Sequence, residues 1–515
     1  MTETTTHRSG PDEEAASAMR PILHYTAKDT WLNDPNGLVW YQGLYHLFYQ
    51  NNPFDNVWGN MSWGHATSSD LLHWTEQPVA IACDEQEDVF SGSIVVDHGN
   101  TSGFGTTEDP ALVAIYTSAF KEGTAYQGTQ AQSLAFSTDA GMTWSKYAGN
   151  PVLARGSAHF RDPKVFRYEG SAGSCWIMVA VEAQHQQVVL YRSDNLKDWE
   201  YLSTFGPANS SEGEWECPDL FPLPVDGDPD NVKWVMVVNV NPGSVAGGSG
   251  GQYFVGHFDG AQFTADRDSL VSPAADGTTD LRRCLWLDWG RDYYAAVSFS
   301  NAPENRRIMI GWMNNWDYAN SLPTSPWRSG MSLAREVELA TVDGLPRLVQ
   351  RPVLPLDSGE PARVLQDVEL HDSGVQLPDA MDGSAQLIEA EILPGTARTV
   401  AFRLLAASDG SAATVLSFDA VTSQLTLDRR NSGNTSFHEK FASAESAPVK
   451  LDDGVLRLRV IVDQSVEAFA QGGSVVLSDL VFPLSGSLGT ELRAEGGTAM
   501  LRKLVVRNLE VTDVH

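Results

Sequence analysis

Short apolar runs separated by turn-forming residues dominate the first 350 residues of the chain. Val, Ile, Tyr, Phe and Trp are concentrated in the runs, Gly, Pro, Asn and Asp lie between them, and helical periodicity is hard to find. The runs span residues 37–50, 90–96, 112–118, 175–181, 233–240 and 308–312. β-Branched and aromatic residues between turn residues are typical of strands, so the pattern predicts an all-β domain.

A turn motif recurs between these runs. Residues 69–74, 137–144 and 193–199 each contain a Ser, an Asp and a downstream Trp, and residues 255–263 form a looser copy. In a tight hairpin turn of this kind the Asp caps backbone N–H groups and the Trp packs against the sheet. The copies recur about every 55–70 residues over roughly 300 residues, which predicts a β-propeller of four or five blades.

The pattern changes after residue 345, where proline becomes frequent and the turn motif stops. In the later run 455–462, positions 456, 458, 460 and 462 are apolar and arginines lie between them, so one face of this strand is buried. Such strands pack as a β-sandwich. We therefore predict a disordered tail at 1–20, a propeller at 21–345, a linker at 346–362 and a sandwich at 363–515. The linker is short and apolar, so we expect the two domains to dock.

Composition narrows the possible partners. The 515 residues suit two or three domains, and 35 Lys plus Arg against 66 Asp plus Glu give a net charge of −31. Such a charge repels nucleic acid and anionic membranes, so neither is an expected partner. The four cysteines include no C-x-x-C pair and are too few for a disulfide framework, which predicts reduced thiols that are mostly buried.

The N-terminus and the hydropathy bear on localisation. Residues 1–20 are polar and contain no apolar stretch of the kind that directs secretion, and the strongest apolar runs, such as 234–240, are far too short to cross a bilayer. As the sequence stands, we expect a cytoplasmic protein, or a secreted one if a leader has been removed.

Three short acidic motifs carry the chemistry. They are WLNDPNG at 31–37, FRDPK at 160–164 and WECPD at 215–219, and each places a carboxylate beside a proline and near an aromatic ring. Proline fixes its own φ and donates no hydrogen bond, so each acid is expected where a strand gives way to a loop. Cleavage of a glycosidic bond needs one carboxylic acid and one carboxylate, which three converging acids would supply.

These motifs, together with FSGS at 90–93, occur in the order and spacing of glycoside hydrolase family 32, which the chain resembles from about residue 25 to its C-terminus. The Gly-rich stretch 242–258 and the segments 286–296 and 462–469 extend the resemblance. It implies a five-bladed β-propeller followed by a C-terminal β-sandwich. It also implies that Asp34 is the nucleophile, that Glu216 is the general acid and base, and that Asp162 holds sugar hydroxyls and stabilises the cationic transition state.

The residue types suit these roles. A nucleophile must be ionised, and we expect Asn33 and the turn amides to keep Asp34 in that form. A general acid must keep its proton, and we expect Trp215 and Cys217 to give Glu216 the low-dielectric surroundings that favour it. A nucleophile and an acid are expected roughly 5–5.5 Å apart, which gives retention of configuration.

Further residues are expected to bind the sugar. Residues that match family positions in the fructose pocket or could offer polar contacts or an aromatic face are Asn33, Gln50, Trp58, Trp63, Phe90, Ser91, Arg161 and Trp316. An Arg beside Asp162 can hold that acid ionised and donate to hydroxyls. The chemistry calls for no cofactor and no metal, and the sequence offers no His or Cys cluster as a metal site.

The resemblance is strongest to the levanase and exo-inulinase group of the family. It implies an exo-acting hydrolase that removes terminal fructose from levan, inulin and fructo-oligosaccharides and accepts sucrose. Alternatives within the family are an intracellular β-fructofuranosidase acting mainly on sucrose and a fructosyltransferase. An alternative of another class, a fructan-binding propeller without catalysis, predicts a missing acid, yet all three are present. The sandwich is expected mainly to brace the propeller, and it could also pair two chains.

Overall fold

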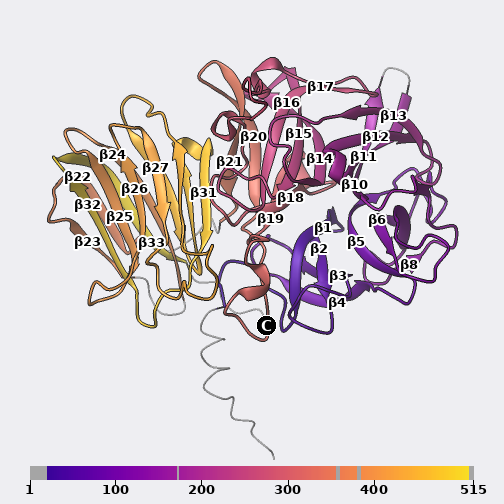
Figure 1. The fold of residues 1–515 in the computed structure, drawn as a ribbon, viewed down its shortest axis with the longest axis horizontal. Helices are drawn as coiled ribbons and strands as arrows, with labels where there is room; N and C mark the ends of the chain where they lie inside the picture. The colour runs from indigo at the N-terminus through magenta and orange to yellow at the C-terminus, as the bar shows by residue number, and fades with distance from the viewer. Residues whose placement is uncertain (1–19, 171–172, 355–359, 380–383, 510–515) are drawn as a thin grey trace, which may run out of the picture.

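Two β-domains lie side by side in the computed structural model, which describes residues 20–170, 173–354, 360–379 and 384–509. Figure 1 shows the first domain as a ring of small sheets and the second as two layered sheets. The tail expected at 1–20 lies outside the described residues except for Arg20, as does part of the expected linker. Among the residues that the structure describes, none of the helices is long and apolar enough to cross a membrane.

The ring consists of antiparallel blades that follow the sequence in order (Figure 1). The first contains β1 (Trp31–Tyr41), β2 (Leu44–Asn52), β3 (Ser62–Ser68) and β4 (Thr75–Ile81). The second contains β5 (Glu87–Val96), β6 (Leu112–Phe120) and β7 (Gln130–Ser137), to which both β8 (Ser145–Lys146) and β9 (Leu153–Ala154) are paired. The third contains β10 (Phe160–Gly170), β11 (Gly173–Glu182), β12 (Gln187–Ser193) and β13 (Glu200–Phe205).

The fourth blade contains β14 (Glu214–Val225), β15 (Asp228–Asn241), β16 (Gly250–Phe258) and β17 (Phe263–Ala265). The fifth contains β18 (Tyr294–Ser298), β19 (Ile308–Trp312), β20 (Arg335–Val342) and β21 (Leu345–Pro352). Short 3₁₀ helices lie in the connections: η1 (Ala183–His185), η2 (Arg267–Ser269), η3 (Leu281–Arg283), η4 (Pro303–Asn305), η5 (Ala319–Ser321) and η6 (Gln471–Gly473).

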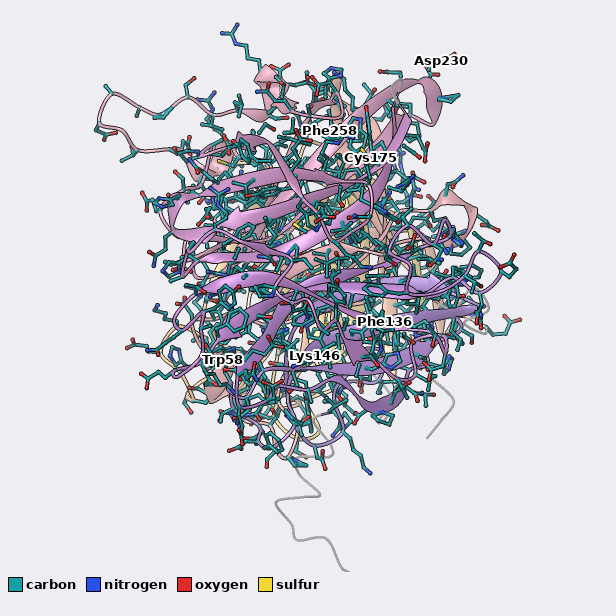
Figure 2. The ribbon with its side chains drawn as sticks, turned by 90° about the vertical axis from the view of Figure 1, so that its right-hand side faces the viewer. Trp58, Phe136, Lys146, Cys175, Asp230 and Phe258 are labelled. Carbon is teal, nitrogen blue, oxygen red and sulfur yellow. The ribbon has the colours of Figure 1, made fainter. Side chains whose placement is uncertain are left out.

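The first strand of each blade lies at the centre of the ring. β1 contacts β5, β5 contacts β10, β10 contacts β14, β14 contacts β18, and β18 returns to β1, so the five strands surround one axis. Figure 2 shows the second, third and fourth blades from the side, one above another. Phe136 lies in the second blade, Cys175 in the third and Phe258 in the fourth. The domain is the five-bladed propeller that the family resemblance implies.

The recurring turn of the sequence joins the third strand of a blade to the fourth. In the first two blades Asp70 accepts the amide of His73 at 2.8 Å and Asp139 accepts that of Thr143 at 2.9 Å. In the third blade Asn195, and not the expected acid at 194, accepts the amide of Asp198 at 2.8 Å. The indole N–H groups of the motif tryptophans then bond backbone carbonyls of their own turns, at 2.9–3.1 Å. The turn motif therefore marks the outer edge of each of these three blades.

The final propeller strand extends past the expected domain boundary at residue 345. β21 pairs with β20 along its whole length, from Leu345 opposite Val342 to Pro352 opposite Arg335. Prolines at 346 and 352 occupy this strand because it is the outer edge of its blade, where one side needs no amide donor. The segment expected as a linker thus begins as part of the propeller sheet.

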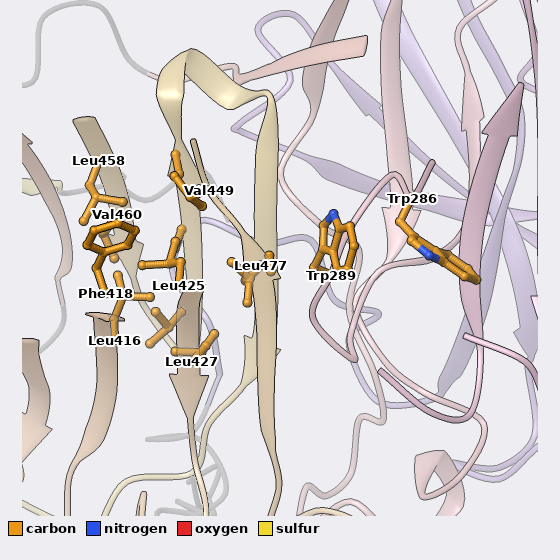
Figure 3. Packing of buried hydrophobic residues seen from close by; sticks show 14 of the residues in the cluster. Trp286, Trp289, Leu416, Phe418, Leu425, Leu427, Val449, Leu458, Val460 and Leu477 are labelled. Atoms are coloured by element: carbon orange, nitrogen blue, oxygen red, sulfur yellow. The ribbon is translucent and has the colours of Figure 1, made fainter. Parts of the chain in front are cut away.

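The second domain is a sandwich of two six-stranded antiparallel sheets. One sheet has the order β22 (Arg363–Leu370), β33 (Ala499–Leu509), β24 (Ala385–Leu393), β29 (Leu456–Val462), β30 (Ser465–Ala470), β31 (Val475–Leu480). The other has the order β23 (Val375–Leu377), β32 (Gly489–Glu495), β25 (Thr399–Ala406), β26 (Thr414–Asp419), β27 (Gln424–Asp428), β28 (Ala444–Pro448). Figure 3 shows apolar side chains of both sheets meeting, with Leu458 and Val460 opposite Phe418, as the alternation in the sequence predicts.

Buried charges tie the sandwich to the propeller. The Arg335 guanidinium lies 2.9 Å from Asp288 of the propeller and 2.8 Å from Glu467 of the sandwich. Arg429 of the sandwich lies 2.6 Å from Asp292 of the propeller. Trp289 packs beside Leu477 at the same interface (Figure 3). The expected docking of the two domains is confirmed, because these side chains are buried on both sides.

Candidate active site

A bulge interrupts each of the five central strands. The pairing shifts register between Leu32 and Pro35 in β1, Phe90 and Gly92 in β5, Arg161 and Lys164 in β10, Glu216 and Asp219 in β14, and Tyr294 and Val297 in β18. A bulge redirects a side chain that would otherwise point between blades. Asp162 and Cys217 adopt φ values of 61° and 42° there, a conformation that non-glycine residues adopt at a cost of about 1–3 kcal/mol.

The redirected side chains line one pocket of about 350 Å³. Its walls are Asn33, Asp34, Gln50, Trp58, Phe90, Ser91, Gln130, His159, Arg161, Asp162, Glu214, Glu216 and Trp316. The three motif acids thus meet although they are far apart in the sequence. Every site residue expected from the sequence lines this pocket except Trp63.

Trp63 lies beneath the pocket and not on its wall. The side chain is fully buried between the first two blades, packed against Phe48 and Tyr116. Its indole N–H donates to the carbonyl of Phe90 at 3.0 Å. The expectation that Trp63 offers a face to a sugar is wrong, because the ring fills the core that supports Phe90.

Asp34 is held by neutral donors. Asn33 donates from Nδ2 to Oδ1 of Asp34 at 3.1 Å, and Ser91 donates from Oγ to Oδ2 at 2.8 Å. The indole of Trp31 fixes the Asn33 amide by donating to its Oδ1 at 2.7 Å. Burial, and then the charge of Glu216, raise the pKa of Asp34, while the hydrogen bonds oppose that shift. Asn33 donates to Asp34 as expected and Ser91 adds a second donor, but among the described residues no turn amide donates to this carboxylate, and burial outweighs the hydrogen bonds.

Asp162 lies deeper, next to Cys217. The backbone N–H of Cys217 donates to Oδ2 of Asp162 at 3.0 Å, and Arg161 Nε lies 3.7 Å from the same oxygen. The thiol of Cys217 sits 3.6 Å from Asp34 Oδ2 and 3.8 Å from Asp162 Oδ2, so it separates the two acids. Burial raises the pKa of Asp162 to about 7, against the opposing charge of Arg161. Arg161 therefore does not hold Asp162 ionised as expected, because burial outweighs its charge and the ionised carboxylate carries a considerable electrostatic cost.

Glu216 accepts hydrogen bonds from two side chains, one of them charged. Arg161 Nη2 lies 3.0 Å from its Oε1, and the hydroxyl of Tyr294 donates to its Oε2. Trp215 does not flank it as expected: neighbouring side chains of a strand point to opposite faces, and Trp215 packs against Phe205 in the blade core. The Cys217 thiol faces the other two acids. The expected apolar surroundings of Glu216 are thus replaced by a guanidinium and a phenol.

Aromatic rings stand at the rim of the pocket. Trp58 is 45% exposed and meets the ring of Phe90 edge-on, with centroids 6.1 Å apart. Figure 2 shows Trp58 at the margin of the molecule. Trp316 stacks on Trp31 with centroids 6.0 Å apart, and it approaches from the fifth blade. These faces suit the apolar C–H surfaces of a sugar ring.

Four residues of the site were not expected from the sequence: Gln130, His159, Glu214 and Tyr294. Glu214 lies two positions before Glu216, and alternation along a strand would have placed both on one face. No comparable sequence pattern marks Tyr294 as a site residue, because its position depends on the fifth blade closing against the fourth. Among the described residues, no group of three His, Cys, Asp or Glu side chains is arranged to hold a metal ion.

The geometry offers a carboxylate fixed by neutral donors and a second acid with charged and phenolic partners, facing one cavity. A nucleophile and a general acid facing one cavity are the two groups that acid-assisted displacement at a sugar carbon requires. The other charged motif residues, Lys164 and Asp219, lie below the cavity, 3.4 Å apart, and link the central strands: Asp219 accepts the amide of Ser298 at 2.7 Å.

Comparison with known proteins agrees with this arrangement. Residues 24–352 match the glycosyl hydrolases family 32 N-terminal domain, and residues 359–512 match the family 32 C-terminal domain. The chain is 43% identical over 500 residues to a levanase of Bacillus subtilis, covering 95% of this chain and 70% of that protein. It is 36% identical over 505 residues to invertase 1 of Saccharomyces cerevisiae, covering 91% and 90%. The crystal structure of an exo-inulinase from Aspergillus awamori superposes with a TM-score of 0.90 at 38% identity, covering 96% and 98%.

Proposed function

Because the chain belongs to glycosyl hydrolase family 32, we propose that it is a retaining exo-β-fructosidase. It removes terminal β-D-fructofuranosyl units from the non-reducing ends of levan, inulin and fructo-oligosaccharides, and it also cleaves sucrose. The observation that carries the proposal is the convergence of Asp34, Asp162 and Glu216 on one pocket. The levanase, exo-inulinase and invertase among its relatives support the substrate class.

Two carboxylates perform the two halves of the reaction. Asp34 Oδ attacks the anomeric carbon while Glu216 gives its proton to the departing glycosidic oxygen, so the sugar becomes esterified to Asp34. Glu216, now a carboxylate, takes a proton from water as that water attacks the same carbon and the ester bond to Asp34 breaks. Two inversions at one carbon give net retention.

The partners of each acid suit its step. Neutral donors from Asn33 and Ser91 fix the Asp34 carboxylate without a cation that would weaken it as a nucleophile. The Tyr294 hydroxyl and Arg161 hold Glu216 towards the cavity and stabilise it after its proton has left. Asp162, buried below, supplies negative charge in its ionised form, where positive charge develops on the sugar.

An experiment with three substrates tests the proposal. Products from levan, inulin and sucrose are followed over time, with Glu216→Gln beside the wild type and Glu212→Gln as a matched control at an exposed position of the same segment. Free fructose from the first time points is expected, with kcat lowered roughly 10²–10⁴-fold in E216Q and unchanged in E212Q. Early oligosaccharides would contradict exo-cleavage, and inactivity of the wild type on all three substrates would contradict the proposal as a whole.

Two further activities use the same acids. A fructosyltransferase would pass the fructosyl unit to a second sugar, so transfer products at high sucrose distinguish it from a hydrolase. An intracellular β-fructofuranosidase would prefer sucrose over polymer. Relatives include an extracellular exo-inulinase, and fractionation of the producing cells with assay of each fraction decides whether this chain meets polymers outside the cell.

A further inference from the structure

One guanidinium nitrogen in the pocket is shared by two carboxylates. Arg161 Nη2 lies 2.5 Å from Oε2 of Glu214 and 3.0 Å from Oε1 of Glu216. Both acids come from β14, two positions apart, and therefore project from the same face. Of the two, Glu214 has the shorter contact with the cation.

The second oxygen of Glu214 is also engaged. Gln184 donates from Nε2 to Oε1 of Glu214 at 3.1 Å, which fixes the carboxylate at the pocket wall with its side chain 37% exposed. Burial raises the pKa of Glu214, but the hydrogen bond and the charge of Arg161 outweigh it, so the net shift is downward. The ionised form of Glu214 is therefore favoured relative to that of a free glutamate.

Arg161 by itself would oppose the chemistry at Glu216. A guanidinium 3.0 Å from a carboxyl favours the ionised form, whereas a general acid has to begin the reaction protonated. An anion bound to the same nitrogen cancels much of that cation's field. Other titratable groups that interact with Glu216 are Tyr294 from β18, Asp34 from β1, Asp162 from β10 and Cys217 from β14 itself.

We propose that Glu214 is a positioning residue that neutralises Arg161 and so lets Glu216 keep its proton at the start of each cycle. The inference rests on the proposed function, because it gives Glu216 the role of general acid. Glu214 acts through Arg161, by drawing the guanidinium to itself when Glu216 is protonated. When Glu216 loses its proton, the same guanidinium lies in place to stabilise the new carboxylate.

The test is the pH dependence of kcat/KM for sucrose in Glu214→Gln. Glutamine keeps an oxygen for Arg161 but removes the charge, so Glu216 loses its proton more easily and the alkaline limb moves to lower pH. We expect a shift of roughly 0.5–1 pH unit, since the side chain is partly exposed and its field is screened. Glu214→Asp, which keeps the charge, should leave the limb close to that of the wild type. E212Q, the same charge change at an exposed position of the segment before β14, should leave it unchanged.

An alkaline limb that stays in place in E214Q, with normal folding by thermal unfolding, would overturn the inference. A higher KM for oligosaccharides without a shifted limb would also overturn it, and would make Glu214 a direct ligand of the sugar. Failure of the proposed function looks different, because the wild type would then release no fructose. If E214Q does not fold, E214D provides the test. An alkaline limb of its kcat/KM profile that is shifted by as much as half a pH unit would contradict a role based on charge.

Discussion

The Tyr294 hydroxyl donates a hydrogen bond to Glu216, which places a phenol from the fifth blade on an acid from the fourth. Tyr294 is fully buried, and burial, followed by the charge of Glu216, raises its pKa well above the ordinary value. The protonated form of the phenol, which donates, is therefore favoured. This contact joins the last blade of the propeller to the proposed general acid.

Replacing Tyr294 by Phe removes one donor from Glu216 and leaves the ring in place. We expect kcat on sucrose to fall roughly 10–100-fold, because a hydrogen bond to a charged group contributes about 1.5–3 kcal/mol. The adjacent Tyr293 offers a matched control, since its buried hydroxyl has no partner among the described residues. Tyr293→Phe should keep full activity, and equal losses in the two variants would contradict the assigned contact.

Asp162 should reduce the stability of the fold in return for its place in the site. Its pKa in the folded state is about 7 against 3.8 for the free group, so between these values the folded chain binds more protons and loses stability as pH rises. Asp162→Asn removes that penalty. We expect its Tm to exceed that of the wild type by at least about 2–4 °C at pH 8, and by less at pH 4, with kcat lowered roughly 10²–10³-fold.

The control for this variant is Asp139→Asn on an outer turn. Hydrogen bonds from Thr143 lower the pKa of Asp139 in spite of slight burial, so its ionised form favours folding. This substitution should lower the Tm slightly at pH 8, a shift opposite in sign to that of D162N. A D162N protein that is less stable than the wild type at pH 8 would show that Asp162 is not a strained group.

Arg335 should be the residue on which the domain interface depends most. It is fully buried between Asp288 and Glu467, so Arg335→Ala leaves Asp288 without its cation and Glu467 with His24 as its remaining one. We expect a loss of about 3–5 kcal/mol in the free energy of unfolding, measured by urea titration. Arg351→Ala, which removes a half-exposed pair with Glu338, should cost less than about 1 kcal/mol.

Removing the sandwich should leave the propeller insoluble. A fragment of residues 1–352 retains β21 but exposes the apolar residues that face the second domain, including Trp289 and Leu333. We expect this fragment in the insoluble fraction after expression. Soluble and fully active protein would contradict the bracing role of the sandwich.

The sequence by itself determined the blades, the two domains and the three acids. Those features are local: a turn Asp caps its own loop, and alternation in a single strand marks its buried face. It did not determine which tryptophans face the cavity. Trp58 and Trp63 lie close together in the sequence, yet Trp58 is 45% exposed at the rim and Trp63 is fully buried.

Only the tertiary structure decided the partners of the acids. Arg161 adjoins Asp162 in sequence, but its guanidinium bridges Glu214 and Glu216 from another blade. Tyr294 reaches Glu216 because the fifth blade closes the ring. Bulges in the central strands set these directions, and a bulge depends on how neighbouring strands pair and pack rather than on any short run of residues. The three acids therefore lie in local motifs that the sequence shows. The packing of the blades around one axis sets which partners each acid has and which way its side chain points.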